Sequence, residues 1–136
     1  MKKVLLLSCF IFSCLFTFAQ DKGFLSLSAD GFEKAIADSS VVVIDVRTSS
    51  EYESGHIPSA KYNIDVLKDD FLFRIDSIVE LKGRTLAVYC KGGSRSKKAA
   101  KLLVGNGYAV IELDCGYTGW VSAGKQKTPE SVSGVL

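Results

Sequence analysis

Three runs of mostly apolar residues recur along the 136-residue chain, each interrupted at most once by an acidic side chain. They are Val41–Val46, Leu86–Tyr89 and Tyr108–Leu113, and β-branched residues are frequent in them. Apolar runs of this length, without strict alternation of polar and apolar positions, are typical of strands buried on both faces, as in a parallel sheet. The pattern therefore predicts three buried strands.

Between and before these runs, apolar residues recur at helical spacing in segments 29–37, 66–81 and 94–104. Ser28 is placed to cap the first helix, and Gly105-Asn106-Gly107 to end the third. The predicted apolar face of the middle helix consists of Leu67, Phe71, Ile75, Ile78 and Val79.

Strands that alternate with helices indicate a doubly wound α/β domain. In such sheets, ligands bind beyond the carboxyl ends of the strands. This rule directs attention to the loops that follow Val46, Tyr89 and Leu113.

Residues 1–19 have the pattern of an export signal: two lysines, an uncharged apolar stretch, and Thr17 and Ala19 at the −3 and −1 positions of a cleavage site. We expect the signal to be removed, leaving a domain over 20–136 without a membrane span, in the periplasm or cell envelope. Lipid modification at Cys9 or Cys14 is the minor alternative, which would anchor the domain to the membrane.

Removal of this segment changes the composition that matters. The whole chain has 17 lysines and arginines against 15 acidic residues, and without Lys2 and Lys3 the balance is 15 against 15. A near-neutral domain gives no indication of nucleic-acid binding. Of four cysteines only Cys90 and Cys115 remain, and with one histidine they are too few for a four-ligand zinc site. We expect no metal.

The loop after the second run carries the most specific chemistry, in the sequence Cys90-Lys91-Gly92-Gly93-Ser94-Arg95-Ser96. The glycines allow successive backbone N–H groups to turn toward one point, and the following helix directs its positive end there. Lys91 and Arg95 add two cations. All these features stabilise a thiolate and an anion above it. The alternative for Cys90 alone is a buried, unreactive thiol.

These residues resemble the active-site loop C-x-x-G-x-R-S of single-domain rhodaneses, which are thiosulfate sulfurtransferases. Two further segments are similar to motifs of that family, in the family's order. One is Ile44–Arg47 with Glu51-Tyr52 and Gly55–Pro58, and the other is Leu113–Trp120. Ser59 and Cys115 depart from the pattern, because each stands where the family has glycine.

The resemblance implies a rhodanese-like fold, with about five parallel strands and helices on both faces. It also implies transfer of sulfane sulfur from thiosulfate to a thiophilic acceptor, cyanide or a thiol, through a persulfide on Cys90, without a cofactor. The residues Lys91, Gly92, Gly93, Ser94, Arg95 and Ser96 would then bind the small anionic donor. Asp45 and Arg47 would support the pocket as an ion pair.

Three alternatives differ in chemistry. Phosphatases of related fold have five residues between cysteine and arginine, whereas only four separate Cys90 from Arg95, so the smaller ring favours sulfur. A persulfide carrier or binding module would use the same loop without turnover. A thiol–disulfide protein would use Cys90 with Cys115 as a resolving thiol; the alternative for Cys115 is an unreactive small residue.

Two other residues are interpreted structurally. His56, the only histidine of the chain, is expected to order the turn 55–58 rather than to act as a base for Cys90. Trp120 is expected to anchor the last helix in the core.

Overall fold

The computed structural model describes residues 23–129. Its centre is a five-stranded parallel sheet with the strand order β1-β5-β4-β2-β3. The strands are β1 (Leu25–Leu27), β2 (Val41–Asp45), β3 (Ala60–Asn63), β4 (Thr85–Tyr89) and β5 (Ala109–Leu113). The predicted parallel α/β sheet is confirmed, and the three apolar runs form its three inner strands.

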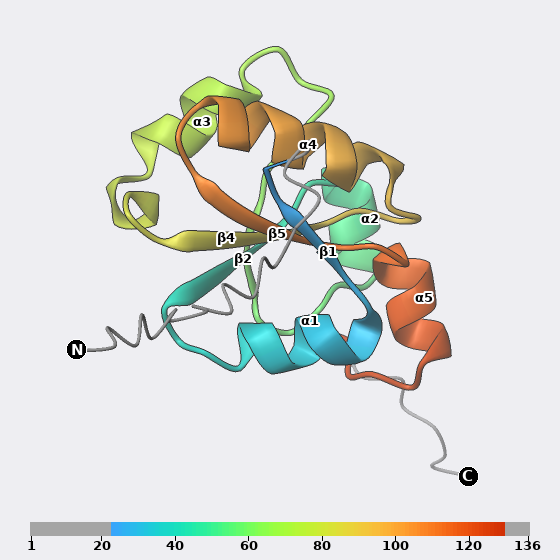
Figure 1. Cartoon of the computed structure of the whole chain (residues 1–136). Helices are drawn as coiled ribbons and strands as arrows, with labels where there is room; N and C mark the ends of the chain where they lie inside the picture. The colour runs from blue at the N-terminus through green and yellow to red at the C-terminus, as the bar shows by residue number, and fades with distance from the viewer. Residues whose placement is uncertain (1–22, 130–136) are drawn as a thin grey trace, which may run out of the picture.

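Helices cover both faces of the sheet, as expected for a doubly wound domain (Figure 1). On one face lie α3 (Phe71–Ser77), the 3₁₀ turn η1 (Val79–Leu81) and α4 (Ser94–Gly105), and on the other lie α1 (Ala29–Ile36) and α5 (Gly116–Ser122). The short helix α2 (Ser49–Ser54) follows β2. Ser28 caps α1 as predicted, because its side chain accepts the N–H of Gly31.

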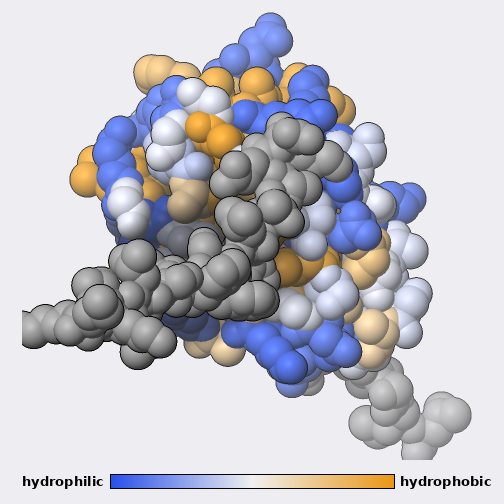
Figure 2. Space-filling model, viewed as in Figure 1, coloured by the Kyte–Doolittle hydropathy of each residue, from blue (hydrophilic) through white to orange (hydrophobic). Residues whose placement is uncertain are grey.

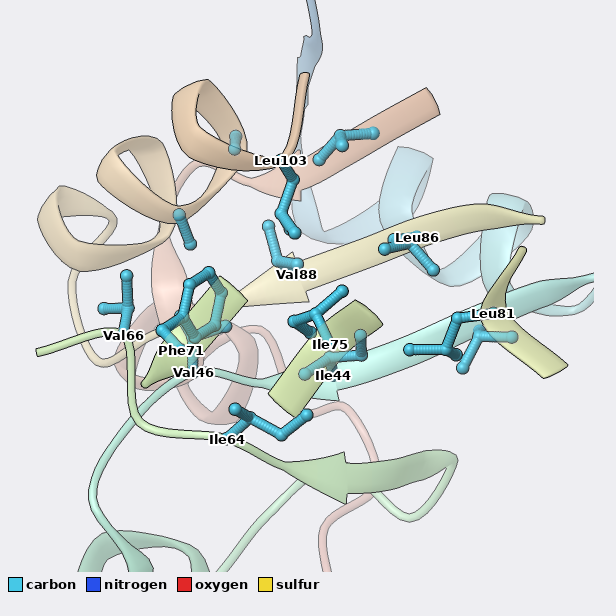
Figure 3. Packing of buried hydrophobic residues seen from close by; sticks show 14 of the residues in the cluster. Ile44, Val46, Ile64, Val66, Phe71, Ile75, Leu81, Leu86, Val88 and Leu103 are labelled. Atoms are coloured by element: carbon cyan, nitrogen blue, oxygen red, sulfur yellow. The ribbon is translucent and has the colours of Figure 1, made fainter. Parts of the chain in front are cut away.

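Two hydrophobic clusters result, one on each face of the sheet. In the first, Phe71 and Ile75 of α3 lie against Ile44 of β2, Val88 of β4 and Val46, which directly follows β2 (Figure 3). The second contains Phe32 of α1 and Trp120 of α5, whose rings meet edge to face at 6.1 Å. The expected core position of Trp120 is confirmed, since its side chain is 3% exposed.

The single helix predicted over 66–81 is wrong in its extent. The chain from Ile64 to Val66 runs beside the end of β2, with the N–H of Val66 donating to the carbonyl of Val46, so helix α3 begins only at Phe71. Ile78 is extended and ends it, before the turn η1. Consequently Leu67 and Val79, assigned to the apolar face, are exposed.

The outer surface is mixed in character. In the view of Figure 2, hydrophilic residues cover much of the face around α1, and hydrophobic residues occur between them over α3 and α4. Within residues 23–129, no helix has the length and apolar character needed to cross a membrane. The predicted export signal, 1–19, lies outside the described residues.

Candidate active site

Cys90 lies at the carboxyl end of β4, in the centre of the sheet edge where the loops after β2, β4 and β5 meet. It is 1% exposed. Its sulfur accepts a hydrogen bond from the backbone N–H of Gly93 at 3.1 Å. Gly93 can direct its amide in this way because it has a φ of 107°, in a region that favours glycine. A Cβ at this position would overlap the backbone of Asp114.

Beneath the sulfur lies a buried polar network. The Cys90 sulfur is 3.4 Å from the hydroxyl oxygen of Ser96, in the first turn of α4, and this hydroxyl is 2.7 Å from a carboxylate oxygen of Glu112. Glu112 is fully buried on β5, where its other oxygen accepts the hydroxyl of Ser26 and pairs with Lys97 at 3.0 Å. The thiol is thereby connected to a carboxylate through one hydroxyl group.

Helix α5 holds the other side of the loop. The N–H of Tyr117 donates to the carbonyl of Cys90 at 2.8 Å, and the N–H of Thr118 to that of Lys91 at 3.1 Å. Because C=O and N–H point in opposite directions across a trans peptide, the N–H groups of Lys91 and Gly92 point away from α5. The two bonds thus fix the orientation of the peptides that follow the thiol.

Arg95 does not present its guanidinium freely to the loop. It forms a two-pronged ion pair with Glu51 of α2, with N–O distances of 2.7 and 2.9 Å. The hydrogen bonds from Arg95, more than any other cause, lower the pKa of Glu51 from 4.5 to about 2. Burial opposes this lowering, and hydrogen bonds from Thr48 add to it. Arg95 therefore joins α4 to α2 at the rim of the site.

Asp45 and Arg47 form a buried ion pair of 2.6 Å at the end of β2. Tyr89 donates its hydroxyl to Asp45, and accepts the N–H of Ile57 on the same oxygen. Burial, and then the charge of Asp45, raise the pKa of Tyr89 well above its usual range. The Arg47 guanidinium lies 4.4 Å from the ring centre of Tyr117, so this network supports α5, which in turn holds the loop.

A cleft of about 360 Å³ opens beside the loop. It is lined by Arg47, Ser50, Glu51, Ser54, Gly55, Lys91, Tyr117 and Thr118. Of the six loop residues expected to bind the donor, Lys91 is the one that lines this cleft. Gly92 and Ser94 are exposed nearby, whereas Gly93 and Ser96 are buried beneath the surface.

The two thiols have different surroundings. Cys115 precedes α5 and is exposed, and its sulfur lies 3.7 Å from the carbonyl of Gly116. Partial burial, more than any other cause, raises the pKa of this thiol. In the described part of the chain, Cys90 and Cys115 form no disulfide, and their sulfurs have no hydrogen-bonding partner in common. The role of Cys115 as a resolving thiol stays a prediction.

His56 lies in the turn after α2. Its Nδ1 atom is 2.8 Å from the carbonyl of Tyr52, and its ring stacks on that of Tyr52 at 3.7 Å. These contacts agree with the interpretation of His56 as a turn residue. Across residues 23–129, no three His, Cys, Asp or Glu side chains are arranged to hold a metal ion.

The geometry and the sequence together match one family. The sequence model of the protein family described as the rhodanese-like domain matches residues 28–123, which include all the elements around Cys90 from α1 to α5. The chain belongs to the rhodanese-like family. This rhodanese-like domain has the fold of sulfurtransferases, and the predicted family and fold class are confirmed.

Solved rhodanese-like structures agree with this assignment. The rhodanese-like domain of a protein from Anabaena is 25% identical, with a TM-score of 0.67 over 82% of this chain and 86% of that one. A rhodanese-related protein from Thermoplasma volcanium has a TM-score of 0.65 at 23% identity, over 76% of this chain and 96% of that one. The latter similarity concerns the fold alone.

Among curated proteins, the chain is similar to a tRNA uridine(34) hydroxylase of Buchnera aphidicola. The two are 33% identical over 91 residues, which make up 63% of this chain and 28% of the hydroxylase. The chain spans less than two-fifths of the length of such hydroxylases. Their name describes a function other than thiosulfate sulfurtransfer, within the same family.

The predicted site residues include the thiol, the glycines and the cations of the loop, but not two acidic residues that the fold brings into contact with Arg95 and Ser96. In the sequence, Glu51 belongs to a motif, and no local pattern predicts its pairing with Arg95. Glu112 interrupts the apolar run Tyr108–Leu113 and has no predicted role in the site. A charged residue inside a strand that is otherwise buried on both faces was the available signal, since such a charge requires buried partners.

Proposed function

We propose that this rhodanese-like domain transfers sulfane sulfur from thiosulfate to a thiophilic acceptor, cyanide or a thiol, through a persulfide on Cys90. The observation that carries the proposal is the position of the Cys90 sulfur. It lies at the first turn of the 12-residue helix α4 and accepts the N–H of Gly93 at 3.1 Å. Backbone N–H groups and a helix N-terminus favour negative charge on sulfur.

The proposed reaction has two displacements. The Cys90 thiolate attacks the outer sulfur of thiosulfate, the S–S bond of thiosulfate breaks, and sulfite leaves with the electron pair. The product is a persulfide anion on Cys90. The acceptor then attacks the terminal sulfur, and the Cys90 thiolate is released, which completes covalent catalysis by a nucleophile. With cyanide as the acceptor, the second product is thiocyanate.

The cations have separate roles in this proposal. Lys91 is exposed and lines the cleft, and we assign to it the attraction of the anionic donor. Arg95 is already paired with Glu51, so its role is to hold the loop against α2. Asp45 and Arg47 support α5 from below. Removal of residues 1–19 during export belongs to the same proposal.

The test is intact mass after incubation with thiosulfate. We expect the protein to gain the mass of one sulfur atom, and to lose it on addition of cyanide. Cys90→Ala should show no gain. Cys115→Ser is the matched control, because it removes the other thiol and should still be loaded. Absence of the gain in the wild type, or its persistence in Cys90→Ala, would refute the proposal.

Turnover separates a catalyst from a carrier. The catalyst should form thiocyanate continuously from thiosulfate and cyanide, with a rate proportional to protein concentration. A single equivalent of thiocyanate, formed once from preloaded protein, would instead identify a persulfide carrier. Identical behaviour of Cys115→Ser under oxidising and reducing conditions would exclude a resolving role for Cys115.

A further inference from the structure

Glu112 is a buried carboxylate that the reaction above does not use. It lies on β5 in register with Ser26 of β1 and Val88 of β4, two residues before Cys90. Its exposed fraction is zero. A carboxylate in such a position is costly unless it is paired and hydrogen-bonded, and here Ser26, Ser96 and Lys97 provide the partners.

Ser96 has a single hydroxyl proton and three acceptors within reach. These are a Glu112 oxygen at 2.7 Å, the Gly93 carbonyl at 3.0 Å and the Cys90 sulfur at 3.4 Å. The Glu112 oxygen is the nearest of the three acceptors, and Lys97 pairs with the same carboxylate at 3.0 Å, so the Ser96 proton points to Glu112. The lone pairs of the Ser96 oxygen then accept the S–H of Cys90.

This arrangement suits the thiol and opposes the thiolate. Once Cys90 loses its proton, the Ser96 oxygen would face a sulfur anion with lone pairs. To donate to the sulfur instead, Ser96 would have to withdraw its proton from Glu112. The carboxylate and the sulfur anion therefore compete for one hydroxyl proton.

We propose that Glu112 is a positioning residue that restrains negative charge on the Cys90 sulfur by holding the hydroxyl proton of Ser96. The Gly93 N–H promotes the thiolate, and Glu112 opposes it from below. Cys90 is also the thiol of the proposed sulfur transfer, so the biological meaning of this inference rests on that proposed function. The state of the thiol is measurable without any sulfur donor.

Other charged groups around the thiol remain in place when only position 112 is changed. In the loop these are Lys91 and Arg95, and Arg95 is paired with Glu51 of α2. Lys97 of α4 is paired with Asp114, which follows β5. Glutamine at 112 would keep an oxygen for Ser26 and Lys97. Its amide N–H would donate to the Ser96 oxygen, so the Ser96 proton would become free for the sulfur.

The experiment is the pH dependence of iodoacetamide alkylation at Cys90, measured in the Cys115→Ser background. In Glu112→Gln, the pH of half-maximal rate should fall by about one unit, the size expected when one hydrogen bond to a charged sulfur is gained. Well below that pH, the alkylation rate of Glu112→Gln should be about ten times that of the protein with Glu112 at the same pH. Glu112→Leu also frees the Ser96 proton and should shift the profile in the same direction, which keeps the test valid if the glutamine variant does not fold.

Two controls separate the Ser96 connection from a general field effect. Ser26→Ala removes the other hydroxyl that donates to Glu112 but has no connection to Cys90, and should leave the profile unchanged. In a Ser96→Ala background, Glu112→Gln should produce less than half of its shift. A full shift in that background, or no shift in the first experiment, would overturn the inference. If Glu112→Gln shows the expected fall in the pH of half-maximal alkylation but the wild type is not loaded with sulfur, only the proposed function is refuted.

Discussion

The ion pair between Glu51 and Arg95 gives a quantitative test of how the site is held together. We consider Glu51→Gln, which removes the charge but keeps the shape and a side-chain oxygen for Thr48, as glutamine also serves in a capping box. The two side chains are 27% and 23% exposed. The variant therefore isolates a partly buried charge interaction from the cap of α2.

The magnitude follows from the pKa of Glu51. A lowering from 4.5 to about 2 corresponds to about 3 kcal/mol in favour of the ionised, paired form. Part of this lowering comes from Thr48, which the glutamine keeps as a partner. We therefore expect Glu51→Gln to reduce the free energy of unfolding by about 2 kcal/mol at pH 7.

The pH dependence has a definite sign. The folded-state pKa lies below the unfolded value, so the contribution of Glu51 is complete above about pH 4.5 and disappears as the pH falls toward 2. Urea unfolding of both proteins at several pH values between 7 and 3 measures this. The difference between them should be constant from pH 7 to about 5.5 and shrink below about 4.5. A difference that is independent of pH, or absent at pH 7, would refute the reasoning.

Three further predictions concern the residues around the loop. Tyr89→Phe should lower the free energy of unfolding by about 1–3 kcal/mol in urea, because the buried N–H of Ile57 loses its acceptor; full stability would contradict this. Gly116→Ala should lower the free energy of unfolding by at least about 2 kcal/mol and abolish sulfur loading, since Gly116 has a φ of 64° and a Cβ would overlap the Lys91 carbonyl. A gain of sulfur mass equal to that of the wild type would contradict this. Lys91→Ala should raise KM for thiosulfate about tenfold with little change in kcat, and the difference from the wild type should diminish at high salt; an unchanged KM at low salt would exclude Lys91 as the donor-attracting cation.

The inner sheet was predictable because its strands are buried on both faces. Thus β2, β4 and β5 appear in the sequence as apolar runs, and Cys90 follows one of them directly. The outer strands β1 and β3 are only three and four residues long, with exposed positions in both, so neither has a recognisable pattern. The predicted helix 66–81 failed at its start because the N–H of Val66 donates to the carbonyl of Val46, just after β2, and this contact between distant segments competes with local helical spacing.

The candidate site was predictable to the same extent. Residues adjacent to Cys90 in the sequence can be proposed for the site because one loop contains them. Glu51 and Glu112 come from α2 and β5, and only the fold brings them to Arg95 and Ser96. Helix α2 has no buried residue, so no apolar periodicity marks it. Contacts between charged groups distant in sequence leave no local pattern. In this site such a contact pairs Arg95 with Glu51, whereas Lys91 is exposed at the cleft.

The two amides of α5 that bind the carbonyls of Cys90 and Lys91 have a consequence for protein engineering. The heptapeptide 90–96 is not a transplantable unit, because in another parallel sheet these two carbonyls would lack their donors. A graft would have to include the segment 115–120 as well, with Gly116 fitting against the loop. For the same reason, we expect insertion of one residue to reach the loop length of phosphatases to fail unless α5 is redesigned with it.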